Sequence, residues 1–139
     1  MKKSVKVLAF VLTFVVLALA LTACAPNSDP DKAVSALKKK EYTAAQDTLI
    51  VPAAVKLLTG KNVTSFVSGT KTVENKDGEK KTETVGIVYF ESKADANDAW
   101  EKMQDYAKDQ NKDKDTDWQV KKSGKMIYWG TKAAINAAA

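Results

Sequence analysis

Residues 83–91 constrain the fold most strongly, because this short stretch is apolar on two faces. Side chains of an extended strand point alternately to opposite sides. One side carries Val85, Ile87 and Tyr89, and the other carries Val88 and Phe90. A strand with apolar residues on both sides belongs in the interior of a sheet. We therefore expect residues 83–91 to form the central strand.

Three further strands and a weaker one are predicted around this stretch. Residues 62–73 are rich in Val, Thr and Phe, and Asp77-Gly78 between them and residues 83–91 is a hairpin signal. Residues 116–122 and 126–131 predict a second hairpin across Ser123-Gly124. Tyr42 to Asp47 reads as a first short strand, with a loop as the alternative.

Apolar residues at helical spacing predict four helices. The clearest covers residues 93–109, with Ser92 as its N-cap. The others are expected over residues 31–40, from near Pro52 to Thr59, and over residues 132–139, where the end of the chain should fray. Residues 48–51 are left open between helix and strand.

This order of elements predicts an α+β fold with an antiparallel sheet of four to five strands. With the first helix and the last set aside, it approximates the split β-α-β pattern of a ferredoxin-like sandwich. We therefore expect the helices to pack on one face of the sheet.

The first residues have the layout of a secretory signal. Lys2, Lys3 and Lys6 precede an apolar run over residues 7–21, which ends in small residues. This run is shorter than the roughly 20 residues that a bilayer-spanning helix needs. We expect residues 1–23 to be a signal peptide.

Leu21-Thr22-Ala23-Cys24 follows this run and resembles the lipobox of bacterial lipoproteins. The resemblance implies cleavage between Ala23 and Cys24, a diacylglycerol anchor on Cys24, and a protein held at the extracytoplasmic face of the cell membrane. Residues 24–30 would then be the lipidated Cys and a tether, and residues 31–139 a single domain. Fully extended, residues 25–30 would reach roughly 20 Å.

A looser resemblance concerns the end of the chain. The Ala-rich helix with a Trp, followed by an aromatic Gly-Thr-Lys-Ala-Ala ending, resembles small uncharacterised lipoproteins of Gram-positive bacteria. This second resemblance implies no activity.

The composition excludes several function classes. The formal net charge is +5, and removal of the three signal lysines would lower it to +2. Lysines and acidic residues alternate along most of the remaining chain, which argues against nucleic-acid binding. The chain has no His, no Arg and a single Cys, so the usual metal, nucleotide and nucleophile motifs are absent. We predict no cofactor and no metal.

Three aromatic residues on the last hairpin, Trp118, Tyr128 and Trp129, form the candidate binding surface. Alternation along a strand leaves at least one of them on each face, and Tyr and Trp are favoured at interfaces. Core packing is the alternative.

Two groups of carboxylates invite a chemical interpretation. Glu91, Asp95 and Asp98 could be paired acids for glycoside chemistry, but negative charge at a helix start usually complements the helix dipole. Residues 113–117 resemble the start of a calcium loop, but they lack the Gly and Glu that complete it. A solvated loop is the preferred interpretation.

The sequence thus predicts a non-catalytic, membrane-anchored domain that binds an unknown protein or small ligand. A small envelope hydrolase or lyase and an inhibitor or immunity-type protein are the alternatives.

Overall fold

The computed structural model describes residues 25–139, so the signal sequence and Cys24 lie outside the described residues. In chain order the elements are α2 (Pro30–Lys39), β1 (Thr43–Asp47), α3 (Ile50–Thr59), β2 (Val63–Glu74), β3 (Lys80–Phe90), α4 (Lys93–Asp109), β4 (Trp118–Ser123), β5 (Met126–Thr131) and α5 (Lys132–Ala137). The predicted α+β class and antiparallel sheet are confirmed.

The five strands form one sheet in the order β1-β2-β3-β5-β4. Every pair of neighbours is antiparallel. The strand at the centre is β3, as the alternation of its apolar residues predicted. The weak strand at residues 42–47 is also present, as β1, and it forms one edge.

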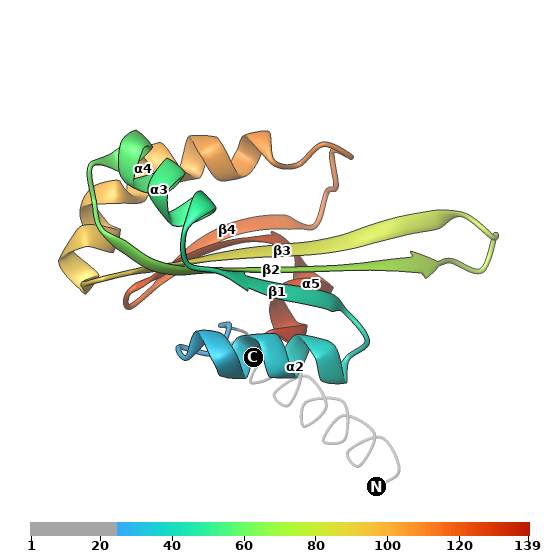
Figure 1. The fold of residues 1–139 in the computed structure, drawn as a ribbon. Helices are drawn as coiled ribbons and strands as arrows, with labels where there is room; N and C mark the ends of the chain where they lie inside the picture. The colour runs from blue at the N-terminus through green and yellow to red at the C-terminus, as the bar shows by residue number, and fades with distance from the viewer. Residues whose placement is uncertain (1–24) are drawn as a thin grey trace, which may run out of the picture.

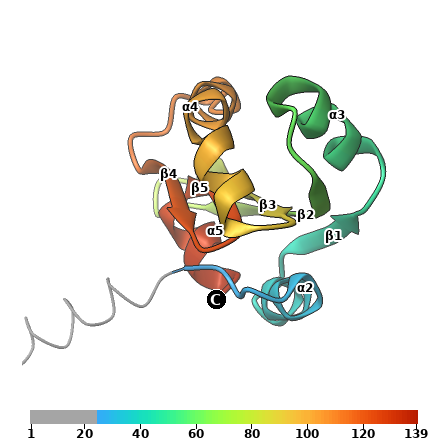
Figure 2. The same cartoon turned by 90° about the vertical axis from the view of Figure 1, so that its left-hand side faces the viewer.

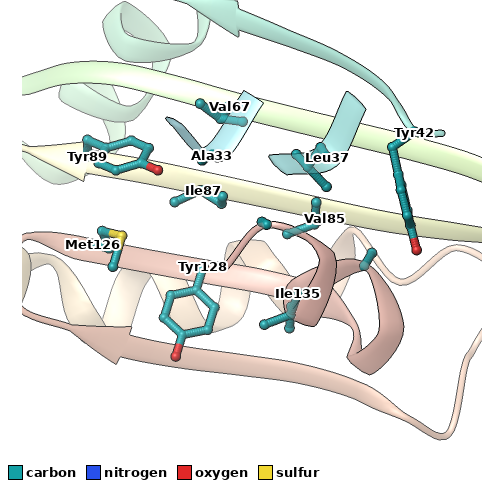
Figure 3. Packing of buried hydrophobic residues seen from close by; sticks show 12 residues of the cluster. Ala33, Leu37, Tyr42, Val67, Val85, Ile87, Tyr89, Met126, Tyr128 and Ile135 are labelled. Carbon is teal, nitrogen blue, oxygen red and sulfur yellow. The ribbon is translucent and has the colours of Figure 1, made fainter. Parts of the chain in front are cut away.

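Helices cover both faces of this sheet (Figures 1 and 2). One face carries α2 and α5, which close a cluster of buried residues shown in Figure 3: Ala33, Leu37, Tyr42, Val67, Val85, Ile87, Tyr89, Met126, Tyr128, Ala134, Ile135 and Ala138. The other face carries α3 and α4 over a second cluster: Val55, Val88, Phe90, Ala96, Ala99, Met103, Ala107, Ile127 and Trp129. The expectation that the helices share one face is therefore wrong.

The predicted ferredoxin-like topology is also wrong. In a split β-α-β unit, the two strands that the helix connects are separated in the sheet by another strand. Here α3 connects β1 to β2, and these two strands are direct neighbours in the sheet. Asp47 at the end of β1 pairs with Phe66 near the start of β2, so the chain returns to the same end of the sheet. The α3 connection therefore works as a wide hairpin rather than as a crossover.

The starts of helices were predicted more accurately than the topology of the sheet. The side chain of Ser92 accepts a hydrogen bond from the N–H of Asp95 at 3.1 Å, as expected of an N-cap. Pro52 lies in the first turn of α3, which begins two residues earlier, at Ile50. The last helix is packed rather than frayed, because Ala134 and Ile135 are buried.

The segment expected to be a tether is part of the folded body from Pro26 onward. Pro26 is buried. The N–H of Asn27 donates to the carbonyl of Ala138 at 2.8 Å, and the Asn27 carbonyl accepts from the Tyr89 hydroxyl at 2.8 Å. Asp29 caps α2 by accepting from the N–H of Asp31 at 2.9 Å. A short polar segment with two prolines thus docks on the domain because its backbone groups find partners there.

Gly86 allows the central strands to pack against an indole ring. Gly86 of β3 pairs with Trp129 of the neighbouring strand β5. A Cβ at Gly86 would lie 2.6 Å from Cε2 of Trp129. Gly86 has no positive φ, so the constraint is the ring and not the backbone. No larger residue fits without displacing the ring.

We expect Gly86→Ala to lower the free energy of unfolding by about 1–3 kcal/mol, as overpacked cores do. Urea denaturation measures this cost in the wild type and in a Trp129→Leu background, where the ring is gone. The two changes should be coupled. An equal cost of Gly86→Ala in both backgrounds would show that the ring is not the constraint.

Candidate functional site

The structure does not bring the three predicted aromatic residues together as an exposed surface. Tyr128 and Trp129 are each only 4% exposed, which makes the prediction wrong for both. Trp118 is half-buried, and its indole N–H donates to the carbonyl of Ala107 at 3.1 Å. Because helices cover both faces of the sheet, the side chains of β5 are buried on both faces.

Trp129 instead lies at the centre of an aromatic cluster beneath α4. The ring of Phe66 stacks on it with 6.0 Å between centroids, and Tyr106 meets it edge-on at 5.7 Å. Such pairs stabilise a core beyond the area that they bury. These aromatic residues hold the fold rather than a ligand.

The exposed apolar side chains gather on and beside α3. The large hydrophobic residues exposed within residues 25–139 are Leu49 at 76%, Ile50 at 79%, Leu57 at 90% and Leu58 at 42%. Sequence reasoning missed this surface because it predicted the helix from its apolar residues without separating a buried side from an exposed one. Val55, by contrast, is almost fully buried, at 2%.

The spacing of residues on α3 explains why one side is buried and another is not. Val51 and Val55 lie four residues apart and face the sheet and α4. Ile50, Ala53 and Leu57 repeat at three and four residues along a different stripe, and all three are exposed. A helix that is apolar all round is normally buried all round. The outer stripe of α3 is therefore a candidate docking surface, here called the outer α3 face.

Asp47 holds the start of α3 in place. Its carboxylate accepts hydrogen bonds from the N–H groups of Leu49, Ile50 and Val51 at 2.7, 3.0 and 2.9 Å. The bonds from Val51 and Leu49 do most to hold the pKa of the Asp47 carboxyl below its ordinary value. One side chain thus satisfies three N–H groups that a helix start leaves without helical partners.

The other end of α3 is fixed as firmly. Gly60 takes a left-handed conformation, with φ of 72°, and its N–H donates to the carbonyl of Lys56 at 2.7 Å. Just beyond, Lys61 forms an ion pair with Asp98 of α4 at 3.1 Å. Both ends of α3 are therefore anchored, and its exposed leucines lie on a defined helix and not on a frayed loop.

Charged residues border the outer α3 face on the side of α4. A shallow depression of about 280 Å³ lies between the two helices, lined by Leu58, Lys102, Asp105, Tyr106 and Asp109. An apolar centre with a polar rim is the common anatomy of a protein interface.

Three of the predicted carboxylates, Asp98, Asp115 and Asp117, pair with lysines. Of the three acids near the start of α4, Asp98 is paired with Lys61, and Asp95 lies in the first turn, where its charge suits the helix dipole. In the loop at residues 113–117, Lys81 Nζ contacts Asp115 at 3.5 Å and Asp117 at 3.3 Å. A lysine ammonium therefore occupies the place between these two carboxylates that a cation would need.

Within residues 25–139 no three His, Cys, Asp or Glu side chains come close enough together to hold a metal ion. None of the helices there is both long enough and apolar enough to cross a membrane.

No protein-family model, curated protein or solved structure matches this chain.

Leu57→Ser should leave the free energy of unfolding within about 0.5 kcal/mol of the wild type, because the side chain already faces water. Val55→Ala, two residues away on the buried side of the same helix, should cost about 2 kcal/mol. Thermal or urea unfolding of both variants provides the comparison. A large loss for Leu57→Ser would mean that the outer α3 face is covered in the folded protein.

Acid should loosen the start of α3. Folding lowers the pKa of the Asp47 carboxyl below its unfolded value, here taken as 3.8. Such a carboxyl stabilises the folded state at pH values above 3.8, and this stabilisation is lost as the pH falls through the lower pKa of the folded state. The protection of the Val51 amide, measured relative to its intrinsic exchange rate at each pH, should therefore decrease below pH 3.8, and Asp47→Asn should remove this acid-dependent step. Asp77→Asn in the β2–β3 turn is the matched control. An unchanged acid step in Asp47→Asn would assign it to another group.

Proposed function

We propose that the protein is a lipid-anchored, non-catalytic binding protein at the extracytoplasmic face of the membrane, and that it docks a protein partner on the outer α3 face. The signal-like start and Leu21-Thr22-Ala23-Cys24 support the anchor. The observation that carries the binding role is the exposure of Ile50 and Leu57 on a helix with fixed ends, with exposed Leu49 just before it.

The shape of the outer α3 face favours a protein partner over a small ligand. Its apolar side chains project outward from a helix instead of lining a cavity, and Leu57 is 90% exposed. A convex apolar helix is recognised by laying it into a hydrophobic groove. Full burial of a Leu or Ile side chain contributes about 1.5–3 kcal/mol, so two or three such residues are enough to anchor an interface.

The position of α3 favours a partner beyond the membrane surface. The chain enters the described structure beside α2, on the face of the sheet opposite to α3 (Figures 1 and 2). An anchor on Cys24 would therefore hold the bilayer near α2 and leave the outer α3 face turned away from it. This arrangement suits capture of a partner in the extracytoplasmic space.

The anchor is tested by Cys24→Ala. We expect this variant to remain unprocessed or to be released to the medium, because the acylated sulfur is gone. Cell fractionation and detergent partitioning measure the change, with Ala25→Ser as the control that should stay processed and membrane-bound. A Cys24→Ala protein that is still processed and still partitions into detergent would contradict the anchor.

The docking surface is tested by a photo-crosslinking amino acid placed at Leu57 in the full-length protein in its own cells. We expect one adduct with a distinct protein, lost when Ile50→Ser is added. Lys108, exposed on α4, is the control site and should give no such adduct. Adducts with lipid, adducts of twice the protein's own mass, or identical patterns at the two sites would each contradict the proposed partner.

A further inference from the structure

The docked N-terminal segment leaves very few residues between the expected anchor and the folded domain. Only Ala25 separates Cys24 from the buried Pro26. A residue spans at most about 3.6 Å, so Cys24 lies within about 11 Å of Asn27. Asn27 is itself fixed by its bonds to Ala138 and Tyr89. If Cys24 carries lipid, the surface around Asn27 must lie against the bilayer.

That surface is basic. An open depression of about 370 Å³ lies between α2 and α5, and its polar lining consists of Asn27, Lys32, Ser35, Lys39, Lys40 and Asn136. No Asp or Glu side chain of residues 25–139 lines it. A second depression next to it is bordered by Lys40 and Lys71. Three lysines, Lys32, Lys39 and Lys40, thus line the depression beside Asn27. Lys71 already has partners, because its Nζ donates to the Lys40 carbonyl at 3.0 Å and lies 4.0 Å from the Glu41 carboxylate.

The remaining charges of α2 do not cancel this basic surface. Asp29 and Asp31 lie at the start of the helix, where Asp29 serves as the N-cap. Lys38, Lys39 and Lys40 follow one another at its other end, and all three are exposed. Lysine heads on long stems can follow an uneven surface of phosphate groups without a fixed geometry.

We propose that this lysine face, defined as Lys32, Lys39 and Lys40, binds the phosphate headgroups of anionic lipids and so orients the domain on the bilayer. The inference rests on the proposed anchor at Cys24. Lysines are attracted to an anionic leaflet, and this attraction fades within a Debye length of about 8 Å. The short connection holds this side of the domain close to the bilayer, where lipid phosphates are concentrated.

The orientation can be measured in vesicles that carry the full lipidated protein. Cys24 is the chain's only cysteine and is acylated in that form, so one introduced cysteine carries a single fluorophore. Ser35→Cys places the dye on α2, and Asn97→Cys places it on the exposed side of α4. The vesicles contain phosphatidylcholine alone or with phosphatidylglycerol, and a headgroup-labelled nitroxide lipid quenches dyes close to the surface.

We expect quenching at position 35 to exceed quenching at position 97 several-fold, and the difference to grow with the phosphatidylglycerol content. The triple change Lys32→Gln, Lys39→Gln and Lys40→Gln should remove the dependence on anionic lipid. The control, Lys93→Gln, Lys102→Gln and Lys108→Gln on α4, removes the same charge and should preserve it. Circular dichroism verifies that both variants are folded.

The outcomes separate the two proposals. Protein that does not float with the vesicles overturns the anchor, and this inference with it. Protein that floats but shows equal quenching at positions 35 and 97 leaves the anchor standing and overturns the orientation. Unequal quenching that is indifferent to anionic lipid, or is lost equally in both triple variants, overturns the role of the lysine face.

Discussion

Tyr89 ties the beginning of the described chain to the centre of the fold. Its side chain lies on the α2 and α5 face of β3, and its hydroxyl donates to the Asn27 carbonyl at 2.8 Å. Burial, and then the negative charge of Asp29, raise the pKa of this hydroxyl, so it keeps its proton and remains a donor. The first described residues are thereby built into the domain, and the site where the chain enters the fold is a fixed point on one face.

The sheet then separates two surfaces of different character. The face with α2 carries the entry of the chain and the lysine face, and the face with α3 carries the exposed leucines. Neither surface borders a deep cleft, and both suit contact with something larger than the domain. We propose from their positions that a bilayer lies on one side and a protein partner on the other. Asp47 and Gly60 matter because they keep the leucines on a helix.

Sequence patterns predicted the features that are set by residues close together in the chain, such as strands and helix starts. The alternation of residues 83–91 placed β3 at the centre, and Ser92 marked the start of α4. That same alternation required cover on both faces of the sheet, which the expectation of helices on one face overlooked. The exposure of α3 and the burial of Trp129 both follow from which face each helix covers, and no local pattern encodes that choice. The docking of Asn27 was equally hidden, because its partners, Tyr89 and Ala138, are distant in sequence.

Amide hydrogen exchange at Asn27 is the most direct test of the proposed orientation, because that orientation depends on this residue being fixed in the fold. We predict that the Asn27 amide is protected nearly as strongly as the amides of β3, and that Tyr89→Phe reduces this protection while Ile87 stays protected. Exchange of the wild-type Asn27 amide at the rate of an unstructured peptide would contradict the account. The segment would then be a loose tether, and the bilayer could lie against any face of the domain.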